Sequence, residues 1–317
     1  MRRLLILAAV AAVAATLFAA YLGFSPAPNT AVGFNNRGEA YRAKAQYERA
    51  IADFDEAIHL DPKLAAAFYN RGLANASKDQ YDRAIADFDE AIRLDPKFVF
   101  AFNGRGDVYT LKAQYDRAIA DFDQAIRLDP KYAFGFIGRG GVYALKAQYD
   151  RAIADFDQAI RLDPQQAVTF TGRGVANFNT GQFAAAADDF EQSLSLDARD
   201  GDVVLWLHLA HARSNRDDAQ ELASNARMVD PKTWPGPILA YYLGRVDADE
   251  VMRAAGNGSA DMPRNQSCQA YFFVGEDAVL RQDIDEAARL LRQARDTCAL
   301  DSFKHAAAEF ELKRLPK

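Results

Sequence analysis

KAQYERAIADFDEAIHLDPK at 44–63 is followed by KDQYDRAIADFDEAIRLDPK at 78–97, KAQYDRAIADFDQAIRLDPK at 112–131 and KAQYDRAIADFDQAIRLDPQ at 146–165. The copies follow one another at a constant interval. A period of about 34 residues with helical patterning is typical of helix-turn-helix arrays, in which one unit cannot bury its apolar face alone and stacks on its neighbours. The repeat therefore predicts an all-α protein.

The residues around each copy carry a signature at fixed spacing. Gly38 and Ala50 are small, as is needed where the two helices of a hairpin cross closely, and Phe54 fills the gap that they leave. Pro62 ends the second helix because its nitrogen has no N–H to continue the hydrogen-bond ladder. These residues resemble the tetratricopeptide (TPR) pattern, which implies an α-solenoid of helix-turn-helix repeats. The pattern recurs through Gly72, Ala84, Phe88 and Pro96; Gly106, Ala118, Phe122 and Pro130; Gly140, Ala152, Phe156 and Pro164; and, more weakly, Gly174, Ala186, Phe190 and Ala198.

This pattern divides the chain into five regular TPR repeats at 31–199 and a less regular part at 200–317. In the second part, a degenerate TPR repeat is expected at 200–231 and a last TPR-like hairpin at 268–299. Between them, 232–266 breaks the period and is expected to form a helical insertion, with short helices around 238–243 and 248–255 and a loop through Arg264. A capping helix is expected at 302–314, because terminal repeats need a polar outer face.

The N-terminal segment, 1–24, differs from the rest of the chain. Met1-Arg2-Arg3 is followed by an uncharged run at 4–24, long enough for a secretory signal or one membrane-spanning helix. Two interpretations of 1–24 stay open, a cleaved signal peptide and an uncleaved membrane anchor. Residues 25–30 are expected to form a linker. Either interpretation predicts a periplasmic protein, soluble or anchored to the inner membrane by its N-terminal segment.

The charge of the chain limits its partners. The formal net charge is −6, and no cluster of five or more basic residues occurs. Nucleic acids and anionic lipid surfaces are therefore not expected as main partners.

The two cysteines, Cys268 and Cys298, lie at opposite ends of the last predicted hairpin. The start of the first helix and the end of the second are neighbours in such a hairpin. In an exported protein this placement favours a disulfide, with two free buried thiols as the alternative.

Motifs for catalysis are missing from the sequence. It contains no G-x-S-x-G elbow, no H-E-x-x-H and no phosphate-binding loop, so no catalytic residue, cofactor or enzyme activity is predicted. His208 and His211 are spaced to share a helix face, but no third ligand is indicated, and no metal site is predicted.

Paired acids recur in the second helix of each regular repeat. Their spacing within a helix suggests partners one turn away on the same face, as for Arg83 with Asp87 and Asp89 with Arg93. These pairs predict a solvated, charged face on the second helices.

A second charge pattern crosses the hairpin. The first five repeats carry Arg before the glycine of the first helix and Asp at a fixed place in the second helix. The last two repeats replace both together, by Trp206 with Leu222 and Val274 with Leu290. This joint replacement predicts a structural ion pair across the hairpin, with arginines lining a binding surface as the alternative.

The TPR resemblance implies that partners bind on a concave face formed by the first helix of each repeat. Apolar residues on that face favour a peptide or partner helix held by a few anchors. The alternative is that some of them pack against the neighbouring repeat. The predicted groove comprises Phe100, Asn103, Asp107, Phe134, Ile137, Leu145 and Phe178.

A second resemblance covers roughly 200–300. Leu205-Trp206-Leu207, Trp234, Tyr241-Tyr242-Leu243-Gly244 and Tyr271-Phe272 resemble the bacterial periplasmic adaptor family called new lipoprotein I. The resemblance implies a non-enzymatic scaffold that links peptidoglycan hydrolases and a protease in the cell envelope. The chain departs from that family in having no lipobox cysteine. The alternative function is a structural assembly factor for a secretion or polysaccharide-export complex, and self-association into a homo-oligomer stays open.

Overall fold

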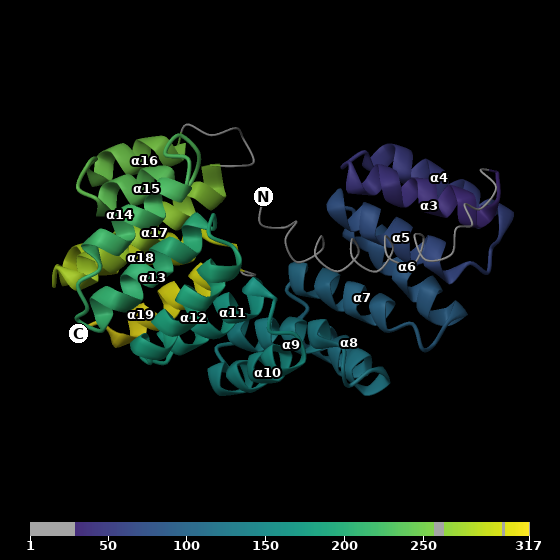
Figure 1. The fold of residues 1–317 in the computed structure, drawn as a ribbon, viewed down its shortest axis with the longest axis horizontal. Coiled ribbons are helices and arrows are strands. Elements are labelled where there is room, and N and C mark those ends of the chain that lie inside the picture. Colours follow the sequence, from purple (N-terminus) through teal and green to yellow (C-terminus); the bar gives the residue numbers. More distant parts are fainter. Residues whose placement is uncertain (1–28, 257–262, 300–301, 317) are drawn as a thin grey trace. The chain divides into compact units, whose positions relative to one another are not determined.

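The computed structural model describes residues 29–256, 263–299 and 302–316 (Figure 1). Within these ranges all regular structure is helical, as predicted. No helix in them is long and apolar enough to cross a membrane. The predicted signal or anchor at 1–24 and the linker up to residue 28 lie outside the described residues.

The chain forms two compact units, and helix α9 (Ala133–Leu145) contributes to both. Unit 1 ends at Arg139 and unit 2 begins at Gly140. The helices of unit 1 form successive hairpins from α3 (Ala31–Ala43), α4 (Tyr47–Leu60), α5 (Ala65–Ser77), α6 (Tyr81–Leu94), α7 (Val99–Leu111) and α8 (Tyr115–Leu128).

Unit 2 continues the repeats and then departs from them. Its regular part contains α10 (Tyr149–Leu162), α11 (Ala167–Asn179) and α12 (Phe183–Leu196). The less regular part contains α13 (Gly201–Arg213), α14 (Ala219–Asn225), a short 3-10 helix (Ala226–Met228), α15 (Gly236–Tyr242), α16 (Ala248–Gly256), α17 (Pro263–Leu280), α18 (Ile284–Thr297) and α19 (Phe303–Arg314). The loop expected through Arg264 is therefore too long, because α17 already begins at Pro263, whose fixed φ suits a first helical turn.

In each of the turns that join the two helices of a regular repeat, one residue has left-handed backbone dihedral angles. Ala45, Asp79, Ala113 and Ala147 have φ values between 53° and 59°, and Gly181 takes the same place in the next turn with φ 81°. A left-handed residue after a helix lets the following N–H groups bond the last free carbonyls. The second helix then starts two residues later, which keeps successive repeats in register.

In the three middle regular repeats, a phenylalanine ring is buried between two glycines from successive first helices. A Cβ built on Gly72 would lie 2.8 Å from the ring of Phe88, and one on Gly104 would lie 3.0 Å from it. Phe156 is enclosed in the same way by Gly140 and Gly172. The close approach of these helices thus depends on two glycines around each ring, of which the sequence pattern pointed to one.

The ion pair predicted across the hairpin is confirmed in four of the five regular repeats. Arg71 bonds Asp87 at 2.6 Å between Nη2 and Oδ1, and the pairs Arg37–Asp53, Arg105–Asp121 and Arg173–Asp189 repeat this contact. In the last two repeats, the apolar replacements Trp206, Leu222, Val274 and Leu290 are all buried.

The expected pairing within the second helices is wrong. Asp87 bonds Arg71, and Asp89 bonds Arg105 of the following repeat. Arg93 instead bonds Glu90, three residues before it. The arginine of a first helix bonds one acid of its own repeat and one of the preceding repeat, so the two acids in each second helix hold adjacent repeats together.

The insertion in unit 2 packs onto the first helix of the last hairpin, α17. Trp234 Nε1 donates to Gln269 Oε1 at 2.8 Å, and the Tyr242 hydroxyl donates to the backbone carbonyl of Phe273 at 2.7 Å. At the end of that hairpin, a disulfide joins Cys268 and Cys298, whose Cα atoms are 4.8 Å apart.

Candidate functional site

Five aromatic side chains of unit 1 form a continuous row across three helices, which we call the aromatic row. Tyr69 lies on α5, Phe98 and Phe100 at the start of α7, and Tyr132 and Phe134 at the start of α9. Their ring centroids are separated by 5.1 Å, 6.1 Å, 5.5 Å and 5.7 Å in that order. Tilted and edge-on contacts at these separations are favourable for aromatic pairs.

The row follows directly from the repeat. Phe98 and Tyr132 occupy equivalent places in successive repeats, as do Phe100 and Phe134, so stacking brings equivalent aromatic positions together. Phe100 remains 38% exposed, a large fraction for an aromatic ring within such a cluster. Ile137, also predicted for the groove, is half-buried on α9.

A buried polar cluster accompanies the aromatic row. Asn103 Nδ2 donates to Asp107 Oδ2 at 3.0 Å, and both side chains are more than nine-tenths buried. Asn103 Oδ1 and the Tyr132 hydroxyl are buried without a hydrogen-bond partner among the described residues. Burial raises the pKa of Asp107 to about 8, against which the Asn103 hydrogen bond acts.

The surroundings of this cluster also raise the pKa of two tyrosines, Tyr69 and Tyr132. Burial raises the pKa of Tyr132, and the charges of Tyr69 and Asp107 raise it further. Burial likewise raises the pKa of Tyr69. The charge of Asp107 thus acts on both tyrosines, and the cluster keeps one acceptor, Asn103 Oδ1, and one hydroxyl, that of Tyr132, without a partner among the described residues.

Two predicted groove residues, Leu145 and Phe178, belong to unit 2. Leu145 is half-buried at the end of α9. Phe178 is completely buried, with its ring centroid 5.1 Å from that of Phe183 and 5.2 Å from that of Trp206. Phe178 therefore packs in the core of unit 2 and presents no surface to a partner.

The first helices of unit 2 are contacted by the chain's own last helix, α19. Besides α18, α19 packs against α11 and α17. It lies in unit 2 (Figure 1), and it reaches α13 through two ion pairs, Lys304–Asp202 and Glu311–Arg213. Lys304 Nζ lies 3.2 Å from Asp202 Oδ2 of α13 and 5.5 Å from the ring centroid of Phe273 on α17. This lysine is buried with its acid, so a helix that carries a basic residue covers part of these first helices.

A four-membered ion cluster of Arg213, Glu276, Glu311 and Arg314 fixes the other end of α19. Arg213 of α13 donates to Glu311 of α19 at 2.6 Å and to Glu276 of α17 at 3.1 Å. Both carboxylates are almost completely buried. Burial raises the pKa of Glu276 and the neighbouring charge of Glu311 raises it further, whereas the charges of Arg213 and Arg314 act against this rise.

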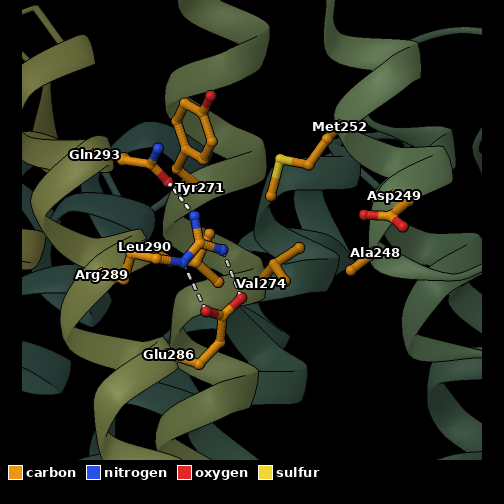
Figure 2. A pocket seen from close by; sticks show the side chains of 9 residues that line it. All are labelled: Ala248, Asp249, Met252, Tyr271, Val274, Glu286, Arg289, Leu290 and Gln293. Atoms are coloured by element: carbon orange, nitrogen blue, oxygen red, sulfur yellow. Dashed lines mark hydrogen bonds and ion pairs between the residues drawn. The ribbon is translucent and has the colours of Figure 1, made fainter.

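A small pocket of about 240 Å³ lies between α16, α17 and α18 of unit 2. Figure 2 shows Arg289 on one wall, bonded to Glu286 and Gln293, and Met252 of α16 on the other side. Val274 and Leu290, the apolar replacements of the repeated ion pair, also line it. Because Glu286 holds Arg289 through two hydrogen bonds, this charge is already matched within the pocket wall.

Comparison with protein families identifies the repeats. The model described as "TPR repeat" matches residues 38–79, and models described as "Tetratricopeptide repeat" match 65–98, 99–132 and 137–166. The lipoprotein NlpI homolog of Haemophilus influenzae is 28% identical over 115 residues, which are 35% of this chain and 37% of that protein. The matched region thus spans little more than a third of that relative's length.

Solved structures share the fold. The Pseudomonas aeruginosa protein PilF is similar with a TM-score of 0.59 and 16% identity, over 68% of this chain and 96% of that chain. A TPR protein of Thermus thermophilus is similar with a TM-score of 0.50 and 19% identity, over 57% of this chain and 98% of that one. At these identities the likeness shows an all-α TPR solenoid and nothing of the partners.

Proposed function

Because residues 38–166 are tetratricopeptide repeats, we propose that this chain is a non-enzymatic protein-binding adaptor whose aromatic row receives a segment of the partner. The observation that carries the proposal is the exposure of Phe100 within a row of five touching rings. Aromatic rings that stay accessible on a rigid surface are preferred anchors in interfaces, because they bury much apolar area at little entropic cost.

We infer from the buried polar cluster that the partner segment carries a basic group. Asn103 Oδ1 and Asp107 supply acceptors, and the adjacent rings of Tyr69 and Tyr132 favour a cation over their faces. A lysine side chain of the partner would satisfy the acceptors and restore the charge of Asp107. Binding would then lower the pKa of Asp107, since an ammonium group stabilises the carboxylate.

Unit 2 gives a model for this contact within the same chain. Lys304 of α19 is buried against Asp202 and lies over the Phe273 ring, so a helix delivers its lysine to an acid on a first helix. We therefore propose that the partner segment at the aromatic row is also a helix that carries a lysine. Helices commonly dock in grooves through a few anchors on one face.

We further propose that the adaptor acts in the cell envelope, where peptidoglycan hydrolases and a protease are the candidate partners. Three observations support this location. They are the uncharged run at 4–24 behind two arginines, the cystine in unit 2, and the partial similarity to the lipoprotein NlpI homolog.

The test compares capture of partners by variants of the full chain. Proteins captured from a solubilised envelope fraction are identified by mass spectrometry, and their affinity is then measured with purified components. We expect Phe100→Ala to weaken binding by about 1–3 kcal/mol and Asp107→Asn to weaken it as well. Leu60→Ala is the matched control, because Leu60 is 47% exposed on α4, a second helix of the same unit.

Circular dichroism and thermal melting show whether each variant keeps its fold. Equal binding by Phe100→Ala and Leu60→Ala, with both folded, would exclude the aromatic row as the partner site. Loss of helicity in Phe100→Ala would assign that ring to the core of unit 1 instead.

A further inference from the structure

A completely buried histidine in unit 2, His211, forms no hydrogen bond within the part of the chain that the structure describes. It lies on α13, its exposed fraction is zero, and neither Nδ1 nor Nε2 has a hydrogen-bond partner among those residues. Burying a polar ring without partners costs free energy, so such a group in a folded protein needs an explanation, such as a bound ion.

Carboxylates face both nitrogens of this ring. Nε2 lies 3.4 Å from Glu191 Oε1, and Nδ1 lies 3.5 Å from Asp218 Oδ2 and 3.7 Å from Glu221 Oε2. The side chains of Glu191 and Glu221 are 40% and 34% exposed, whereas Asp218 is buried. The ring is therefore at the bottom of an acidic site that opens to solvent on the side of the two glutamates.

We propose that His211, Glu191 and Glu221 bind a zinc ion. One ligand atom from each residue can be chosen so that all lie within 4.8 Å of one another. Bonds of about 2.0–2.2 Å in a tetrahedral zinc site place ligand atoms roughly 3.4 Å apart. The separation of His211 Nε2 and Glu191 Oε1 already has this value. The partly exposed Glu221 has to turn toward Nε2 to complete the set, because its Oε2 lies 3.7 Å from Nδ1.

Asp218 has a positioning role in this site. With the metal at Nε2 of His211, the Nδ1–H group faces Asp218, which orients the ring as carboxylates do behind zinc-bound histidines. Asp218 also contacts His208 Nδ1 at 2.9 Å, which holds the carboxylate in place. Water would fill the fourth position, on the solvent side.

Zinc fits this donor set better than other cations. Calcium and magnesium prefer sites built entirely from oxygen, whereas a mixed set of imidazole and carboxylate suits zinc and neighbouring transition metals. Both cysteines of the chain are in the disulfide, so a thiolate site does not compete.

Arg216 takes the place of the cation in the absence of metal. Its Nη1 donates to Glu191 at 2.9 Å and its Nη2 to Glu221 at 3.4 Å, so the guanidinium bridges the two carboxylates. The Arg216 side chain is 53% exposed and can turn outward when a metal enters. Arginine and zinc therefore compete for the same two acids.

The experiment is calorimetric titration of ZnCl2 into the full, untagged chain after treatment with a chelator, with zinc content measured after gel filtration. We expect one zinc ion per chain. His211→Ala and Glu221→Gln should each weaken binding at least tenfold, and Arg216→Ala should tighten it several-fold, since it removes the competing charge. The matched control is His59→Ala, because His59 is exposed on α4 of unit 1.

Glu221→Gln keeps the size of a partly exposed side chain, so it tests the site even where His211→Ala fails to fold. No zinc in the gel-filtered chain, or the same affinity in Glu221→Gln and the parent chain, would overturn the proposal. So would a loss in His59→Ala as large as in Glu221→Gln, or weaker binding in Arg216→Ala, which would assign the arginine a purely structural role.

Discussion

The enclosure of the Phe156 ring between two glycines predicts opposite effects for two Gly→Ala changes in unit 2. A Cβ on Gly172 of α11 would lie 2.6 Å from Cζ and 2.9 Å from Cε1 of Phe156. The ring has little room to move away, because a Cβ-sized group at Gly140 would itself lie only 3.1 Å from Cε1 of the same ring. Gly141 of α9 is the control, since a Cβ there meets nothing within 4 Å.

The magnitudes follow from two terms. Overpacking a buried ring costs about 1–3 kcal/mol, whereas replacing glycine by alanine inside a helix gains roughly 0.5–1 kcal/mol. Gly141→Ala has only the gain, so it should stabilise the chain by roughly 0.5–1 kcal/mol. Gly172→Ala carries both terms and should be less stable than Gly141→Ala by about 1–3 kcal/mol.

Urea denaturation followed by circular dichroism at several chain concentrations measures this difference. The dependence of the unfolding free energy on urea concentration is compared between the two variants. A change in this slope would indicate separate unfolding of the two units rather than a shift in stability. If Gly172→Ala is as stable as Gly141→Ala, the ring of Phe156 is not confined by the two glycines and the reasoning fails.

Three further predictions concern single contacts. Arg105→Ala should destabilise unit 1 by about 2–4 kcal/mol, because Asp121 then stays buried without its partner. Changing Arg105 and Asp121 together to leucine should recover most of this lost stability, which a double-mutant cycle measures. Burial raises the pKa of Glu276 to about 8, so its contribution to stability is fully present below its unfolded pKa and is lost as the pH rises to the folded pKa. Glu276→Gln should therefore flatten the fall in stability between these two pKa values. Urea denaturation at a series of pH values measures this, and an unchanged fall in the variant would refute it. Non-reducing peptide mapping should recover Cys268 and Cys298 in one linked peptide, and reduction should lower stability by about 3 kcal/mol; two free thiols in the map would contradict this.

Much of the fold is present in the sequence because the repeats interact mainly with their neighbours. The repeat period sets the helix boundaries, and the joint replacement of Arg and Asp by Trp206 and Leu222 marks two positions that touch. A contact repeated in several copies can be inferred by comparing the copies with one another.

Contacts that occur once leave no such signal, and a contact between repeats can be missed even where it recurs, because the acid has another arginine one turn away on its own helix. Asp89 has Arg93 one turn later on its own helix, yet it bonds Arg105, which stacking brings alongside. Phe178 has the same apolar character as Phe100, but the packing of Trp206 buries only the former. Whether an apolar residue is an anchor or part of the core depends on what covers it, and that is set by three-dimensional packing.

The sequence by itself determined the class of fold, the repeat register and the residues of the local hairpin contacts, since these rest on periodicity and on interactions within one hairpin. Only the tertiary structure decided that α19 turns back onto α11, α13 and α17 and that His211 meets Glu191 and Glu221. The first arrangement joins elements far apart in the chain, as between Asp202 and Lys304, and the second joins the consecutive helices α12, α13 and α14. Both depend on the path of the chain through space, because neither has a repeated copy in the sequence.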